Sequence, residues 1–450
     1  MKLAVAACLA VLLPGSLLAQ PAAPLRLPYT QFTLPNGLHV ILHEDHSVPV
    51  VSVNVWYHVG SAREKPGRTG FAHLFEHLMF MGSGHVEPGE FDQLLESVGG
   101  NNNGSTENDR TNYVIDVPSN ALELALFLES DRMGYLLDSM TPKTVDAQRD
   151  VVKNERRQSV ENRPYGMADS VVLTEMLYPE GHPYHWPVIG YMPDLTAASY
   201  DDVVAFFKSY YAPSNASLVV AGDLDTAKAR VLVEKWFGDV KAGAPVTPMT
   251  IPGVALTSVQ KKTITDRVQL PRLYIAWLTP ASLAPGDAAL DMVADVLAGG
   301  KNSRLYKRLV FDMQIAQNVS AFQVSQALSS HFVIRATPQP GHTVDELQKV
   351  IDEELARLQA EPPTDHEVQR AINQIEASFY SRMERVGGFG GKADQLNRYY
   401  TDTGNPDWFN EDLARYRAQS PTDVQAAAQA FLPKDRRVEL TVAPEAARQP

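Results

Sequence analysis

Phe71-Ala-His-Leu-Phe-Glu-His-Leu-Met-Phe80 is the most informative segment of this 450-residue chain. It places His73 and His77 four residues apart, with the carboxylate of Glu76 between them. If the segment is helical, both imidazoles project from one face, one turn apart. The spacing therefore predicts that the two histidines bind one metal ion, with a carboxylate nearby that can accept a proton from water.

The pattern is H-x-x-E-H, the inverted form of the H-E-x-x-H zinc motif. A surface helix that shows a polar face is the alternative interpretation. The remaining residues of the segment argue against it. Apart from His73, Glu76 and His77, all residues from Phe71 to Phe80 are apolar, and a helix this apolar is buried on most sides. Buried imidazoles and a buried carboxylate need partners, and a zinc ion would provide them.

A catalytic zinc ion usually has three protein ligands and one open position. The best candidate for the third ligand is Glu155, which lies 78 residues after His77. It belongs to a predicted helix in which Thr141 is the N-cap and Pro142 the first helical residue. Valines on one face of this helix predict that it packs against the core.

The chain resembles the pitrilysin/insulinase type of zinc peptidase, which includes the mitochondrial processing peptidases. The resemblance rests on H-x-x-E-H, on Arg149-Asp-Val-Val152 followed by Glu155, and on Gly99-Gly-Asn-Asn-Asn-Gly-Ser-Thr-Glu-Asn-Asp-Arg-Thr-Asn-Tyr113. It covers nearly all of the chain after residue 27. It implies a metal-bearing subunit with one Zn²⁺, held by His73, His77 and Glu155, and with Glu76 as general base.

By the same resemblance, the segment 99–113 contains an edge strand that lines the cleft. Asn103, Thr106 and Tyr113 are then candidates to contact a peptide substrate, which would bind as an added strand. The alternative is turn chemistry, since the residues from Asn101 to Ser105 would also form a good loop.

Two departures from the family pattern affect the expected site. Many relatives carry an acidic residue seven positions before the liganding glutamate, where this chain has Gln148. An amide can still accept a hydrogen bond from a ligand imidazole, but it adds no charge, so we expect Gln148 to weaken metal affinity as an outer-shell partner.

The second departure concerns an Arg and a Tyr, seven residues apart, that help active relatives hold substrate and stabilise the oxyanion. This chain keeps the surrounding sequence, Ser303-Arg-Leu-Tyr-Lys-Arg-Leu309. At the positions of the Arg and the Tyr it has Val310 and Gln317. The resemblance then implies a homologous, metal-free subunit that supplies the pair in a heterodimer, although a homodimer is possible. The alternative is a local misalignment, with Arg304 and Tyr306 or Arg308 as substitutes.

Residues 1–19 read as a secretory signal peptide, with Lys2, an apolar run and small residues near Ala19. The run is short for a membrane anchor, which is the alternative, and no other stretch is long and apolar enough to span a bilayer. The single cysteine, Cys8, lies inside this segment. A periplasmic or secreted protein without thiols is the expectation.

The chain has 40 basic and 53 acidic residues, a formal net charge of −13. No basic run or stripe is present of the kind that nucleic-acid binding requires. Composition therefore argues against a nucleic acid as partner.

The second half repeats the pattern of the first at an interval near 220 residues. We expect a metal-binding domain at 28–240, a Pro- and Gly-rich linker at 241–257 and a degenerate homologous domain at 258–450. The segment from Val293 to Leu297 falls near the position of the motif and has no set of metal ligands. The predicted fold is α+β: two homologous domains, each a largely antiparallel sheet with helices on one face, forming half of a clamshell.

The sequence thus predicts a zinc-dependent endopeptidase that hydrolyses peptides or unfolded segments. A non-catalytic assembly or peptide-binding subunit of the same fold is the main alternative. A zinc hydrolase for a small non-peptide amide is a third interpretation.

Overall fold

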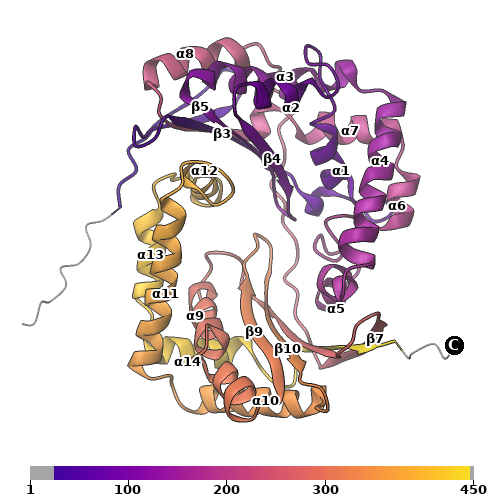
Figure 1. The fold of residues 1–450 in the computed structure, drawn as a ribbon, viewed down its shortest axis with the longest axis vertical. Coiled ribbons are helices and arrows are strands. Elements are labelled where there is room, and N and C mark those ends of the chain that lie inside the picture. Colours follow the sequence, from indigo (N-terminus) through magenta and orange to yellow (C-terminus); the bar gives the residue numbers. More distant parts are fainter. Residues whose placement is uncertain (1–24, 446–450) are drawn as a thin grey trace, which may run out of the picture.

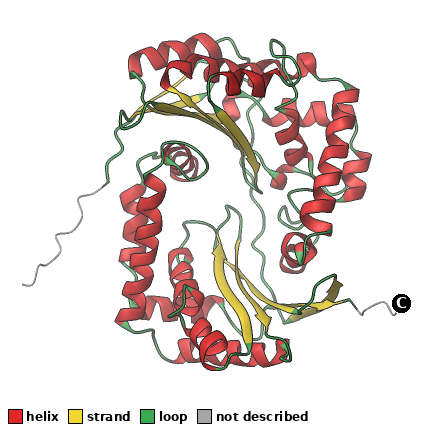
Figure 2. Cartoon of the chain, in the orientation of Figure 1, coloured by secondary structure: helices red, strands yellow, loops and turns green. Residues whose placement is uncertain are grey.

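The computed structural model describes residues 25–445, and the expected signal peptide at residues 1–19 lies outside the described residues. The chain forms two α+β units that face each other (Figures 1 and 2). We call them the first half, which contains β1 to β6, and the second half, which contains β7 to β11. Residues 241–257 join them without helix or strand.

The first sheet has the order β1-β2-β6-β3-β5-β4. Its strands are β1 (Thr30–Thr33), β2 (His39–Glu44), β3 (Val50–Tyr57), β4 (Asn101–Thr106), β5 (Thr111–Pro118) and β6 (Ala216–Gly222). The pair β2–β6 is parallel, and all other neighbours are antiparallel.

The second sheet has the order β7-β11-β8-β10-β9. Its strands are β7 (Gln260–Asp266), β8 (Arg272–Thr279), β9 (Ala316–Val324), β10 (Ser330–Pro338) and β11 (Val438–Pro444). Again only the pair β7–β11 is parallel. This order equals that of the first sheet without β1, so the repeat expected from the sequence is present in the topology, and the α+β fold class is confirmed.

Helices surround both sheets. In the first half they are α1 (Phe71–Leu78), α2 (Glu90–Ser97), α3 (Leu122–Ser139), α4 (Pro142–Arg156), α5 (Leu173–Leu177), α6 (Met192–Ala197), α7 (Tyr200–Tyr210) and α8 (Thr226–Phe237). In the second half they are α9 (Asp287–Ala298), α10 (Val344–Ala360), α11 (Asp365–Met383), α12 (Lys392–Thr403), α13 (Phe409–Arg417) and α14 (Pro421–Phe431). None of these described helices has both the length and the apolar character needed to cross a bilayer.

The central strands β3 and β6 are mostly apolar and buried along nearly their whole length. A strand buried on both faces needs cover on both sides of the sheet. On one face Val53, Leu218 and Val220 pack against helices of their own half. On the other face Ile41 and Val219 pack against α11, α12 and α13, which come from the second half.

The two halves thus exchange helices. Figure 1 shows α12 beneath the first sheet, where it contacts β3 and β6. In return α5 and the π-helical segment Ala168–Val172 of the first half cover β8 and β11 of the second sheet. Each sheet therefore carries helices of its own half on one face and helical cover from the other half on the opposite face.

Polar contacts fix α12 on the first sheet. The buried carboxylate of Asp394 accepts hydrogen bonds from Trp56 Nε1 at 2.9 Å, Asn112 Nδ2 at 2.9 Å and Asn54 Nδ2 at 3.3 Å. One turn on, Asn397 donates to Asn54 Oδ1 at 2.9 Å. These bonds select one position of the helix, because a shift would leave buried polar groups without partners.

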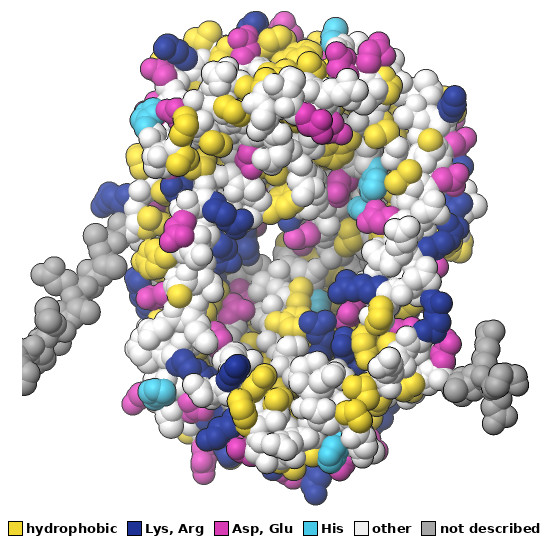
Figure 3. Space-filling view, viewed as in Figure 1, with side chains coloured by type: hydrophobic (Ala, Val, Ile, Leu, Met, Phe, Trp, Pro, Cys, Tyr) yellow, Lys and Arg dark blue, Asp and Glu magenta, His cyan; other side chains and the backbone are white. Residues whose placement is uncertain are grey.

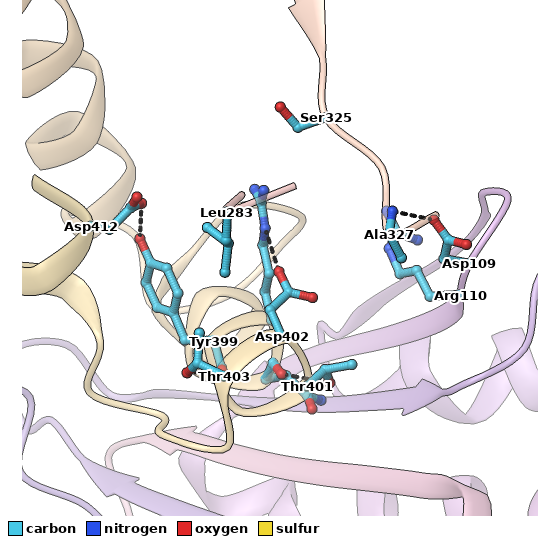
Figure 4. Close-up of polar contacts among 12 residues, drawn as sticks. Asp109, Arg110, Leu283, Ser325, Ala327, Tyr399, Thr401, Asp402, Thr403 and Asp412 are labelled. Carbon is cyan, nitrogen blue, oxygen red and sulfur yellow. Dashed lines mark hydrogen bonds and ion pairs between the residues drawn. The ribbon is translucent and has the colours of Figure 1, made fainter. Parts of the chain in front are cut away.

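A second junction joins the hairpin tips of the two sheets. Asp109, between β4 and β5, accepts from the backbone N–H of Ala327, between β9 and β10, at 3.1 Å (Figure 4). Tyr184 Oη donates to the same carboxylate at 2.7 Å.

A cavity of about 860 Å³ lies in the second half, between α9, α11, α12 and α13. Leu283, Ser325, Tyr399, Asp402 and Asp412 line it (Figure 4). None of the candidate metal-binding residues lines this cavity, so it is a separate feature of the molecule.

We predict that Asp394→Ala lowers the free energy of unfolding by about 1–3 kcal/mol, because buried donors of β3 and β5 lose their acceptor. Urea unfolding followed by tryptophan fluorescence measures the loss. The control is Asp402→Ala on the same helix, whose side chain is one-third exposed and pairs with Arg398 at 3.5 Å. It should cost about 0–1 kcal/mol, and equal losses for the two variants would contradict the role given to Asp394.

Candidate metal centre

Helix α1 brings the two motif histidines toward α4. Gly70, the N-cap of α1, has φ 86°, a left-handed conformation that favours glycine. Within the helix Leu74 and Phe75 are fully buried, while His73 and His77 lie on the side that faces α4. Their rings are 4.8 Å apart between centroids and nearly perpendicular.

Helix α4 supplies the third group. It begins as the sequence predicts, with Thr141 accepting a hydrogen bond from Thr144 N at 3.1 Å and Pro142 at the first position. In its last turn Glu155 Oε2 lies 3.1 Å from His77 Nε2 and 3.6 Å from His73 Nε2. Val152, one turn before the end of the helix, is buried against the core of the first half.

The three side chains fit a zinc ion. Their ligand atoms all lie within 4.8 Å of one another. Zn–N and Zn–O bonds of about 2.0–2.2 Å at tetrahedral angles separate ligand atoms by roughly 3.3 Å, close to the two distances observed. Two imidazoles and a carboxylate are also a known ligand set of catalytic zinc.

The pKa shifts of His73 and Glu155 favour the protonation states that bind a metal ion. Burial lowers the pKa of His73 to about 4, and the neighbouring His77 acts in the same direction. The hydrogen bond from His77 lowers the pKa of Glu155. A neutral imidazole and an ionised carboxylate are the states that bind a metal. His73 Nδ1 is buried without a partner among the described residues.

Glu76 lies between this cluster and the edge strand β4. Burial raises its pKa, although the hydrogen bond from Thr106 opposes the shift. That bond, from Thr106 Oγ1 to Glu76 Oε2, is 2.6 Å long. Gly104 makes the approach possible, since a Cβ at this position would lie 2.9 Å from Glu76 Cγ. A proton acceptor is thus held beside the three metal-binding candidates.

The segment that contains Asn103 and Thr106 is a strand rather than a loop. It is β4, the last strand of its sheet, and so one of its edges is unpaired among the described residues. Asn103 is exposed on it, and Thr106 is partly buried against Glu76.

Tyr113 does not lie on the exposed edge, which corrects the expectation for this residue. It is opposite Gly104 on β5, fully buried, with its ring against Phe80 and under the Arg132 guanidinium at 4.3 Å. Cross-strand partners face the same side of a sheet, so Tyr113 points inward with Gly104. Its ring therefore packs on the buried face of the sheet, on the same side as Gly104 of β4.

Gln148 also differs from the expectation. Its Nε2 donates to Met81 Sδ, a residue just after α1. Among the described residues it makes no hydrogen bond to a candidate ligand imidazole; the contact with Met81 uses the amide Nε2 and not the Oε1 that could accept from an imidazole.

Sequence reasoning missed Glu64. Its buried carboxylate accepts from Gly70 N at 2.9 Å and from Ala72 N at 2.8 Å, and so caps the start of α1. Gly70 has no side chain to cap the helix, so the oxygens of Glu64 act as the acceptors, and burial raises the pKa of this carboxyl although the backbone hydrogen bonds oppose the shift. A glycine at the expected N-cap is the one sequence signal that a remote cap was needed.

The second half has neither member of the Arg/Tyr pair at the expected positions. Val310 packs on the core from the π-helical segment Tyr306–Asp312, and Gln317 is exposed on β9. The possible substitutes are held within the second half: Arg304 pairs with Glu367 at 2.6 Å, and Arg308 with Glu354 at 2.9 Å. Both arginines are thus engaged in ion pairs, and the misalignment alternative stays a hypothesis.

Comparisons with known proteins agree on one family. Residues 39–179 match the model described as insulinase (peptidase family M16), and residues 197–375 match the model of the peptidase M16 inactive domain. The zinc protease PqqE of Helicobacter pylori is 32% identical over 390 residues, which cover 85% of each chain. The chain belongs to peptidase family M16, and its relatives support a metallopeptidase.

Solved structures agree in fold. A protease from Helicobacter pylori has a TM-score of 0.85 at 27% identity and covers 93% of this chain and 100% of that chain. The periplasmic protease PqqL from Escherichia coli has a TM-score of 0.73 at 16% identity, over 94% of this chain and 48% of that chain. The latter shows likeness of fold, and its chain is about twice as long as the matched region.

We predict that the ion pair of Arg304 makes stability depend on acid pH. Burial alone would raise the pKa of Glu367, but the hydrogen bonds from Arg304 outweigh it and lower the pKa from 4.5 to about 2. The folded state therefore keeps the carboxylate ionised where the unfolded state is protonated, so the stabilisation is present above pH 4.5 and is lost as pH falls toward 2.

Glu367→Gln tests this, because glutamine keeps the capping box with Thr364 and removes the charge. The wild-type advantage should be about 1 kcal/mol at neutral pH after solvent screening, and thermal midpoints at pH 7 and pH 3 should show it shrinking. A difference between the two proteins that does not change with pH would contradict the prediction.

Proposed function

We propose that this chain is a zinc-dependent endopeptidase that hydrolyses peptides or unfolded segments, with His73, His77 and Glu155 as metal ligands and Glu76 as general base. The proposal rests on one observation: these four side chains lie together beside β4, whose outer edge is unpaired among the described residues. One zinc ion per chain fits the donor atoms.

Zinc bound to these ligands would supply Lewis-acid activation of a water molecule and of the scissile carbonyl. Glu76 accepts the proton of the attacking water and passes it to the leaving amine. Burial raises the pKa of Glu76, and a higher pKa makes its carboxylate a stronger proton acceptor. Thr106 holds the carboxylate in place between the metal ligands and β4.

The substrate is proposed to bind as an extra strand along β4. Main-chain bonds to the edge would supply affinity with modest sequence preference. Asn103 and Thr106 remain candidates to contact it. The face drawn in Figure 3 is hollowed between the two halves, and Lys and Arg side chains gather around the hollow. We propose that an extended peptide enters through this hollow to reach the edge strand.

We treat residues 28–240 as the catalytic domain and 258–450 as the degenerate domain, joined by 241–257. A homologous subunit that contributes an Arg/Tyr pair is proposed as partner, since Val310 and Gln317 replace the pair here. The double length of PqqL, a periplasmic protease, is consistent with two such units acting together. The location of PqqL and the signal-like residues 1–19 support a periplasmic or secreted location.

A non-catalytic peptide-binding subunit is the second candidate, and the replaced Arg/Tyr pair is the observation that favours it. Cleavage of a quenched peptide library by the purified chain alone, with and without chelator, tests whether the chain is an endopeptidase without a partner. Chelator-sensitive cleavage supports the endopeptidase. Absence of cleavage by a folded, zinc-loaded sample favours a chain that is inactive alone.

We predict that Glu76→Gln lowers kcat on such peptides at least about a hundredfold, because the general base is lost. Zinc content, measured by atomic absorption, should stay at one per chain, since Glu76 is not among the proposed ligands. Glu96→Gln, an exposed carboxylate on α2, is the matched control and should leave kcat unchanged. Wild-type turnover by Glu76→Gln would remove Glu76 from the mechanism.

We also predict that Thr106→Val lowers kcat about tenfold without changing zinc content, because a hydrogen bond to a charged group is lost. Thr106→Ser, which keeps the hydroxyl, should recover most of the rate. If the loss instead appears only in KM, Thr106 contacts substrate rather than orienting Glu76.

A further inference from the structure

A tight turn, Pro187–Tyr191, lies between the start of α1 and the end of α4. The bond from Gly190 N to Pro187 O at 2.8 Å closes the turn. Gly190 has φ 77°, a conformation that favours glycine. The turn is therefore rigid and has room for two helix ends to approach it closely.

On one side the turn contacts the start of α1. A Cβ on Gly190 would lie 2.5 Å from Gly70 Cα, so the two glycines pack backbone against backbone. Tyr191 N donates to Thr69 Oγ1 at 2.9 Å, and Thr69 Oγ1 donates to Asp194 at 2.7 Å. The N-terminus of the helix that carries His73 and His77 is thus fixed to this turn.

On the other side the turn is bound by Arg156, the neighbour of Glu155. Its side chain is 6% exposed, and its Nε donates to the carbonyl oxygen of Gly190 at 2.9 Å. Its Nη1 pairs with Glu161 in the π-helical segment Arg157–Glu161 that follows α4. A planar guanidinium held at two points has little freedom to move.

We infer that Arg156 is a positioning residue that sets the distance between Glu155 and the two histidines, and so tunes metal affinity. The inference rests on the proposed zinc site. The chain of contacts is short: Glu155 is adjacent to Arg156, Arg156 binds Gly190, and Gly190 packs on Gly70 at the start of α1.

The contact of Arg156 with Gly190 holds α4 next to the proposed ligand Glu155. Glu155 lies just before Arg157, where α4 passes without a break into the π-helical segment Arg157–Glu161 and the helical hydrogen-bond pattern changes. Residues that support a metal ligand from outside commonly change affinity by about 10- to 100-fold when they are removed. Without Arg156, Glu155 would keep its place in the sequence and lose its fixed register against α1.

The experiment compares Arg156→Met with Arg157→Met. Methionine keeps an unbranched apolar stem and removes the donors. Arg157 is the next residue, exposed, and donates to Asn154 of α4 at 2.6 Å, so its variant controls for loss of an arginine here. Each mature chain is stripped of metal, its thermal midpoint is measured, and zinc affinity is determined by competition with a chromophoric chelator.

The expected result is a zinc affinity about 10- to 100-fold weaker for Arg156→Met, with a metal-free midpoint near that of Arg157→Met, and no change of affinity for Arg157→Met. Equal affinities for both variants and the wild type would overturn the inference. A wild-type chain that binds no zinc would overturn the proposed function as well, so the two failures are distinguishable.

If Arg156→Met does not fold, Arg156→Lys replaces it. Lysine keeps the charge and loses the planar fork. The same weakening, to a smaller degree, supports the positioning role, and unchanged zinc affinity in folded Arg156→Lys overturns it.

Discussion

The packing of α1 against α4 is the contact on which the candidate metal centre depends, because each helix alone carries an incomplete set of ligands. The helices belong to distant parts of the chain, and a ligand set tolerates errors of only about half an ångström. Three features restrict the position of α1 relative to α4. They are the Glu64 cap at the start of α1, the buried Val152 on α4 and the turn at Gly190 between the two helices. Precision at the site is built from backbone contacts as much as from side chains.

The second organising feature is the cover of the two sheets. Each half has helices of its own on one face and receives cover for the other face from its partner half. Apolar packing makes this exchange favourable, and the buried bonds of Asp394 and Asn397 give it a single register. The edge strand β4 and its hairpin are thereby held at a defined position relative to the second half.

Local patterns were sufficient to predict a large part of this structure. The motif helix and the Thr141 cap follow from periodicity and capping chemistry, which act over a few residues. The repeat follows from the similarity of the two halves. Glu155 required a known family pattern. The inward position of Tyr113 could in principle be read from alternation along β5, but only once its register with Gly104 is known. The contacts of Gln148 with Met81 and of Arg156 with Gly190 join segments that are distant in sequence, and no local pattern encodes them.

The exchange of helices has a consequence for how the chain is made. The apolar face of the first sheet that includes Ile41 and Val219 is completed by helices whose residues come after position 365. During synthesis or export this face stays exposed to water until nearly the whole polypeptide has emerged. Partly made chains with exposed sheet surface are prone to aggregate. The order of the elements along the chain thus delays completion of the first half until α11, α12 and α13 have been made.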